Sequence, residues 1–182
     1  MQIEELSVTG VKVITPKVFG DQRGFFLESF NKRLYDEAGI QGEFVQDNHS
    51  KSAKGVIRGL HFQKEYPQGK LVRVTAGEVW DVILDIRKGS PSFGQWVGVH
   101  ISAENKKQVW VPAGLAHGFA VLSEIAEFMY KVTDYYHPED EKGVLWDDPS
   151  LKIDWKVKDA VLSEKDRLLP RFQDAMDDFP EF

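Results

Sequence analysis

The segment GVIRGLHFQ, residues 55–63, places an arginine and a histidine inside an apolar run. The apolar positions alternate as in a buried strand: Val56, Leu60 and Phe62. An arginine without a partner in such a strand costs several kcal/mol of desolvation. Histidine changes its charge near neutral pH, so it can act as a general base. Something must offset that desolvation cost, and a local basic pocket for a small anion is one candidate.

The spacing of these two residues raises an objection to a shared site. Side chains alternate along a regular strand, so Arg58 and His61 would lie on opposite faces. Gly59 stands between them, and a glycine within a strand often marks a β-bulge that redirects the next side chain. We expect a bulge, or an equivalent break in the ladder, at Gly59.

Ring side chains occupy alternate positions of two later segments. One face carries Phe128, Tyr130, Val132, Asp134 and Tyr136, and another carries His117, Phe119 and Val121. Taken singly, each ring is more often a core residue whose polar atom is satisfied locally. Taken together, two tyrosines and a histidine could line one apolar interior.

A metal site is the next candidate. PAGLAH, residues 112–117, resembles the second motif of cupins, a family of small double-stranded β-barrels, and suggests a ligand at His117. The first cupin motif needs His-x-His and a nearby glutamate, whereas here His61 is followed by Phe62, Gln63 and a glutamate that comes too soon. We expect no bound metal, because a transition-metal site would lack a ligand or two.

Composition excludes several other classes. The 182 residues carry a net charge of -6 and no cysteine, which argues against nucleic acid as a partner and excludes disulfides, thiolate catalysis and iron–sulfur clusters. Dinucleotide, Walker and Gly-x-Ser-x-Gly motifs are missing. Neither a membrane-spanning run nor a signal peptide is recognisable. We expect one cytoplasmic domain over residues 1–182, with 173–182 as a tail that is frayed or packed on the surface.

The elements that must position these residues are mostly short strands. Apolar runs recur at near-regular spacing between Gly, Pro and polar residues, which predicts a β-sandwich or barrel. Residues 70–90 contain two such runs around positions 76–78 and predict a hairpin. Short helices are expected over 31–39, which ends at a glycine, and over 163–169, which begins with Ser163 as N-cap.

Motifs along nearly the whole chain resemble the dTDP-4-dehydrorhamnose 3,5-epimerase family, in the family's order. They are DQRGFFLESF (21–30), QDNHSKSAKGVIRGLHFQ (46–63), GKLVRVTAGEVWDVILDIRKGSPSFGQW (69–96), VPAGLAHGF (111–119), EFMYKVTDYY (127–136) and LSEKD (162–166). The resemblance implies a cupin-like jelly roll, usually a homodimer, that works without metal or cofactor. It implies conversion of dTDP-4-dehydro-6-deoxy-D-glucose to dTDP-4-dehydro-L-rhamnose.

The same resemblance implies roles for four residues. His61 matches the family's base, Tyr130 its acid on the opposite wall, and Asp166 the carboxylate that orients the imidazole. Lys70 matches the cation beside the C4 oxygen of the sugar. Asp166 also fits a helix capping box with Ser163, and both roles can hold together. Lys70 could otherwise be an ordinary lysine at the edge of a strand.

The resemblance further implies a set of substrate contacts. Tyr136 falls where the family stacks an aromatic ring on thymine. The other positions that match the family's substrate-binding residues are Arg23, Glu28, Gln46, Asp47, Asn48, Arg58, Lys70, His117, Glu141 and Lys165.

Three alternatives stay open at this point. A single-site epimerase acting at C3 or C5 alone would keep the same base and acid. A sugar-nucleotide-binding cupin without catalysis would not need a base opposite an acid. A metal-dependent cupin enzyme would be inhibited by chelators.

Overall fold

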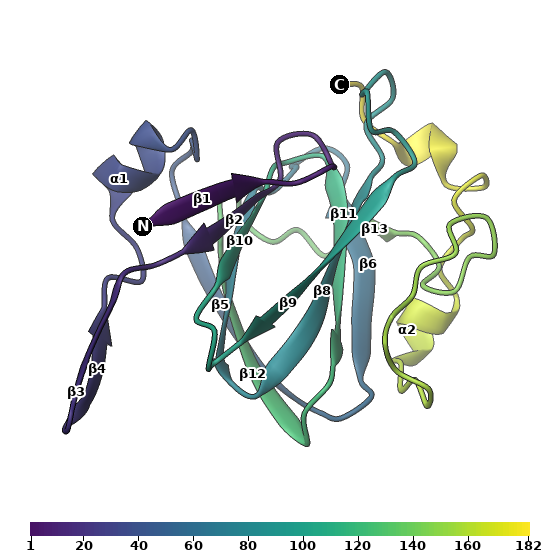
Figure 1. The fold of residues 1–182 in the computed structure, drawn as a ribbon. Coiled ribbons are helices and arrows are strands. Elements are labelled where there is room, and N and C mark those ends of the chain that lie inside the picture. Colours follow the sequence, from purple (N-terminus) through teal and green to yellow (C-terminus); the bar gives the residue numbers. More distant parts are fainter.

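Two antiparallel sheets face each other in a computed structural model that describes residues 1–182 (Figure 1). One sheet has the strand order β1 (Gln2–Glu5), β2 (Lys12–Thr15), β10 (Gln108–Val111), β7 (Lys70–Ala76), β12 (Ile125–Val132) and β5 (Gln46–Ala53). The other has the order β13 (Glu141–Gly143), β6 (Ile57–Gln63), β11 (Leu115–Val121), β8 (Glu78–Asp85) and β9 (Trp96–Ser102). The predicted mainly β sandwich is confirmed.

The main core lies between the two sheets. Val72 and Val74 of β7 and Phe128 of β12 belong to one buried cluster with Ile83 of β8 and Phe119 of β11. Their neighbours along each strand point to the outer faces, as the alternation of side chains requires. The predicted shared face of 127–136 is confirmed for its β12 members, because Phe128 and Val132 are buried and Tyr130 packs against the same core.

The hairpin predicted around positions 76–78 is wrong. β7 and β8 are consecutive in sequence but belong to different sheets, and the chain passes from one sheet to the other at Gly77. Gly77 has a φ of 72°, and a Cβ there would lie 2.0 Å from the Ile125 carbonyl oxygen. A glycine between two β runs indicates a tight turn, but the local sequence does not encode which strand each run pairs with.

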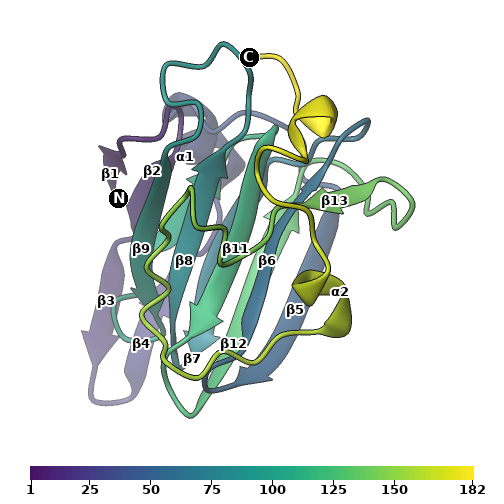
Figure 2. The ribbon, with the colours of Figure 1, turned by 90° about the vertical axis from the view of Figure 1, so that its right-hand side faces the viewer.

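The C-terminal segment covers the outer face of the five-stranded sheet (Figure 2). It contains helix α2 (Glu164–Arg167) and the 3-10 turn η1 (Met176–Asp178). Ala175 and Phe179 are 3% and 4% exposed, in a cluster with Phe62 of β6. Residues 173–182 are therefore packed on the surface of the sandwich, and not frayed.

Helix α1 (Lys32–Glu37) covers part of the outer face of the six-stranded sheet. Its buried Tyr35 packs with Leu71 and Trp110. Asn31 caps α1, as Ser163 caps α2, so both predicted helices are confirmed. No helix is long and apolar enough to cross a membrane.

A hairpin of β3 (Val18–Asp21) and β4 (Gly24–Leu27) stands clear of the sandwich (Figure 1). Phe25 and Phe26 are 63% and 66% exposed, and Phe19 on the paired strand is 53% exposed. Phe19 and Phe26 are paired across the hairpin, so their rings share a face that the rest of this chain leaves exposed.

The packing of the C-terminal segment can be tested by truncating one ring. We expect Phe179→Ala to lower the free energy of unfolding by about 3–5 kcal/mol, because it opens a cavity among Phe62, Phe93 and Phe172. Urea denaturation measures the change. Phe182→Ala is the matched control, since that ring is 63% exposed. Equal effects of the two substitutions would contradict a packed terminal segment.

Candidate active site

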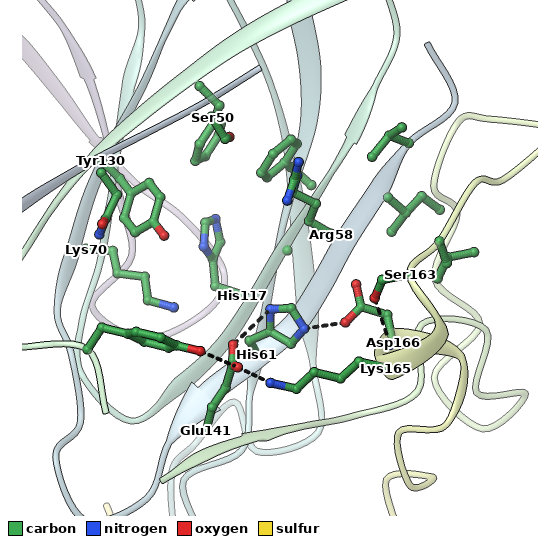
Figure 3. Close-up of a pocket in the computed structure, with 18 of the residues that line it drawn as sticks. Ser50, Arg58, His61, Lys70, His117, Tyr130, Glu141, Ser163, Lys165 and Asp166 are labelled. Atoms are coloured by element: carbon green, nitrogen blue, oxygen red, sulfur yellow. Dashed lines mark hydrogen bonds and ion pairs between the residues drawn. The ribbon is translucent and has the colours of Figure 1, made fainter. Parts of the chain in front are cut away.

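A pocket of about 750 Å³ opens between the sheets, and polar side chains line both walls (Figure 3). The five-stranded sheet contributes Arg58, His61, His117 and Glu141, and the six-stranded sheet contributes Asn48, Lys70 and Tyr130. Tyr136 and the segment around α2 complete the lining, the latter through Ser163, Lys165 and Asp166. Side chains from distant parts of the sequence thus meet in one cavity.

A bulge in β6 brings Arg58 and His61 to the same cavity. His61 pairs with His117, but Arg58 pairs with Phe119, so three steps along β6 match two steps along β11. Gly59 has a φ of 112°, and a Cβ there would lie 2.6 Å from Gly118 Cα. The break expected at Gly59 is confirmed, and both side chains line the pocket.

His61 forms a close pair with Asp166. Its Nε2 lies 2.7 Å from Asp166 Oδ1, and the Asp166 amide donates to Ser163 Oγ at 3.1 Å. Burial would raise the pKa of Asp166, but the hydrogen bond with His61 and the attraction of its charge outweigh burial and lower that pKa. An ionised Asp166 holds the imidazole proton on Nε2. Nδ1 is then left with a free lone pair, as a base requires.

Glu141 lies on the other side of the imidazole. Its Oε1 is 3.6 Å from His61 Nδ1, while its Oε2 accepts a 2.9 Å hydrogen bond from the Tyr136 hydroxyl and pairs with Lys165. Burial would raise the pKa of Glu141, but the hydrogen bond from Lys165, followed by the charge of His61, lowers it. Glu141 is therefore ionised at neutral pH.

Tyr130 and Lys70 stand on the opposite wall. Burial, followed by repulsion from Glu141, raises the pKa of Tyr130, so its phenol keeps its proton at neutral pH. Burial lowers the pKa of Lys70 to about 8, although Glu141 and Asp81 act in the other direction. A proton donor and a cation thus face the imidazole across the cavity. Lys70 therefore differs from the ordinary strand-edge lysine that the sequence left as an alternative.

Asp81 is a residue that sequence reasoning missed. It is fully buried, and its Oδ1 lies 2.8 Å from His117 Nε2, while its Oδ2 has no partner. This second carboxylate–imidazole pair fixes the ring of His117 in the pocket wall. The available signal was an aspartate between Trp80 and Val82 in a strongly apolar strand, since buried carboxylates require a partner.

Four predicted contacts do not line this pocket. Arg23 and Glu28 lie on or beside the exposed β3–β4 hairpin, and Arg23 pairs with Asp21 instead. Asp47 pairs with Lys131 at 2.9 Å. Gln46 lies beside the pocket, because its side-chain amide donates to Asn48 Oδ1 and accepts from the backbone N–H of Tyr136.

No three His, Asp or Glu side chains are arranged to hold a metal ion together. The residue that the cupin-like motif suggested as a ligand, His117, is paired with Asp81.

Comparisons with known proteins agree with one another. A family model described as dTDP-4-dehydrorhamnose 3,5-epimerase matches residues 5–174. Proteins of that name from Pseudomonas aeruginosa and Shigella flexneri are 59% and 56% identical, covering 99% and 96% of this chain and 100% and 98% of their own lengths.

Two solved structures are informative neighbours. The 3,5-epimerase of Legionella pneumophila in complex with dTDP-4-keto-L-rhamnose is 53% identical, with a TM-score of 0.96 and coverage of 100% of this chain and 98% of that one. A 3′-monoepimerase of Streptomyces bikiniensis in complex with dTDP-quinovose is 31% identical, with a TM-score of 0.92. The match covers 97% of this chain and 91% of that one.

The environment of Lys70 predicts an unusual titration. In an NMR titration of isotope-labelled lysines, we expect one amine to have a pKa of about 8 and to be absent from Lys70→Met. Because the unfolded value is near 10.5, the native state binds fewer protons between these values, and stability therefore rises with pH across that range. A Lys70 resonance that titrates above pH 10 would contradict the desolvation of this amine.

Proposed function

This chain belongs to the dTDP-4-dehydrorhamnose 3,5-epimerase family, and we propose that its pocket inverts carbons 3 and 5 with His61 as base and Tyr130 as acid. The enzyme is an isomerase that converts dTDP-4-dehydro-6-deoxy-D-glucose to dTDP-4-dehydro-L-rhamnose. The observation that carries the proposal is the paired imidazole of His61 on one wall of the cavity, facing a protonated phenol and an amine on the other.

The chemistry needs one base, one acid and one cation. Carbons 3 and 5 both flank the C4 ketone, so loss of a proton from either gives an enolate whose charge rests on the same oxygen. Lys70 can stabilise that oxygen in both reactions, because a positioned charge in a buried site contributes a few kcal/mol. Inversion then requires a proton to leave one face of the carbon and return to the other.

His61 removes the proton through Nδ1. Asp166 holds Nε2–H and stabilises the imidazolium that forms, in the way that a carboxylate supports histidine in other acid–base pairs. Tyr130 donates its phenolic proton from the opposite wall. Its raised pKa supports this role, because the group must be protonated before each inversion.

The nucleotide half of the substrate requires cations and a flat partner. Arg58 and Lys165 line the pocket and supply positive charge for the diphosphate, where charge-assisted hydrogen bonds contribute about 1.5–3 kcal/mol. Tyr136 is 46% exposed beside them and presents an aromatic ring for thymine. The Arg58 guanidinium is also oriented by a 3.0 Å hydrogen bond from Nε to Ser52 Oγ.

Deuterium exchange tests the assignment of base and acid. With the dTDP-4-keto sugar in deuterium oxide, the wild-type enzyme should incorporate label at carbons 3 and 5. His61→Ala should lose exchange at both carbons by a factor of about 1,000 or more while keeping its affinity for dTDP, because a base acts mainly in the transition state. Tyr130→Phe should still exchange label but fail to invert either carbon.

His100→Ala is the control, since that histidine is exposed and pairs with Glu78 away from the pocket. Wild-type exchange in His61→Ala, or efficient inversion in Tyr130→Phe, would refute the corresponding role. Label at one carbon only in the wild-type protein would indicate a single-site epimerase.

We also propose that the enzyme is a homodimer in which the β3–β4 hairpin of one copy completes the pocket of the other. Arg23 and Glu28 match the family's substrate contacts but do not line the pocket of their own chain. The hairpin that carries Arg23 also exposes Phe25 and Phe26. A second copy covers these rings and brings Arg23 and Glu28 to a substrate.

Mixing two inactive variants tests this arrangement. If Arg23 acts in the partner's pocket, a mixed dimer of Arg23→Ala and His61→Ala contains one intact site. Random exchange of subunits should therefore restore about a quarter of the wild-type activity. Sedimentation should show dimers for both variants and a shift toward monomer for the Phe25→Ser/Phe26→Ser double variant, but not for Phe182→Ser. An absence of recovery in confirmed mixed dimers would place Arg23 in its own subunit's site.

A further inference from the structure

We propose that Glu141 carries the abstracted proton from His61 to solvent and so resets the base between the two epimerisations. This inference rests on the proposed function, in which His61 must accept a proton twice for each sugar. It assigns to Glu141 a step in proton transfer, in addition to any contact with the substrate.

The strand pairing sets Glu141 beside the base. β13 pairs with β6 so that Gly143 is opposite His61 and Glu141 is opposite Gln63. Residues two apart share a face of a strand, and Gly143 has no side chain, so Glu141 is the β13 side chain that extends toward His61. Figure 3 shows its carboxylate between the imidazole and Lys165.

The two carboxylates around His61 differ in their contacts. Asp166 lies 2.7 Å from Nε2, which is a hydrogen bond, whereas Glu141 lies 3.6 Å from Nδ1, which is too long for one. The lone pair on Nδ1 is therefore free to take a proton from carbon. Once Nδ1 is protonated, a small rotation of either side chain brings the new N–H to Glu141 Oε1.

The two carboxylates also differ in access to solvent. The Asp166 side chain is 6% exposed and pairs with His61 Nε2, whereas the Glu141 side chain is 14% exposed. Glu141 Oε2 contacts the Tyr136 hydroxyl and the Lys165 amine, whose side chain is 55% exposed. Glu141 is the group that joins Nδ1 to the mouth of the pocket.

The proton balance closes with these groups alone. The C–H bond breaks, its electrons form the enolate, and the proton binds Nδ1. It then passes to Glu141 Oε1 and on to water, and the lowered pKa of Glu141 keeps its carboxylate ionised and able to accept the next proton. Tyr130 gives its proton to the opposite face of the carbon and takes another from water. Each inversion therefore releases one proton to solvent and takes up one.

Glu141→Gln tests the proposal, because glutamine preserves the size and the hydrogen-bonding oxygen but cannot carry the proton. In single-turnover exchange in deuterium oxide, labelling of the first carbon should stay within about threefold of wild type. Labelling of the second carbon should slow by about tenfold or more, with accumulation of singly inverted sugar. Added imidazole buffer at constant pH and ionic strength should restore the second step in this variant and leave the wild type unchanged.

Two further variants keep the result interpretable. Glu141→Asp retains a carboxylate and should recover part of the second-step rate without buffer. Glu139→Gln is the matched control, because that side chain is 75% exposed and pairs with His137 outside the pocket. An equal slowing of both carbons, or an increase in KM alone, would overturn the relay and leave Glu141 as a binding residue. Failure of the wild-type enzyme to label both carbons would instead overturn the proposed function.

Discussion

The single extra residue in β6 is the constraint on which the pocket depends. Without the bulge, His61 would keep its register with His117 but Arg58 would turn to the outer face of the sheet. The bulge requires glycine at position 59, because the backbone lies against Gly118 with no room for a Cβ. A local break in hydrogen-bond register thus converts a buried strand into one that carries an imidazole and a guanidinium into the same cavity.

Burial then gives the two walls of the cavity different proton affinities. On the wall with Tyr130 and Lys70, the same loss of hydration raises the pKa of the phenol and lowers that of the amine, because each change favours the neutral form. On the opposite wall, hydrogen bonds and a nearby imidazole keep Asp166 and Glu141 ionised despite partial burial. Negative charge therefore surrounds the base, while a proton donor and a cation face it. That polarity suits a reaction in which a proton leaves one face of a carbon and another arrives from the other.

The sequence predicted those features that local chemistry determines. Alternation placed Tyr130 with Phe128, capping residues located both helices, and a glycine between two polar residues located the bulge. Strand pairing was less accessible: the turn at Gly77 looked like a hairpin, although the two strands join different sheets. Asp81 and His117 are 36 positions apart, so the sequence does not show that they pair. Its only indication was a charged residue within an apolar strand. Other site residues, such as Arg23, were predicted only from the resemblance to a family. Arg23 does not line the pocket of its own chain.

The distance in sequence between His61 and Asp166 links stability to catalysis. The two residues are 105 positions apart, and Asp166 reaches the imidazole only because the C-terminal segment is docked on the outer face of the five-stranded sheet. Helix α2 is too short to be stable alone, so its position depends on the buried side chains that flank it, including Trp155 and Phe179. Local opening of this segment requires less free energy than global unfolding, and it separates the carboxylate from the base. A substitution that loosens this packing therefore frees the imidazole from Asp166 before the sandwich unfolds. On heating such a variant, activity is lost at a lower temperature than the one at which the core unfolds.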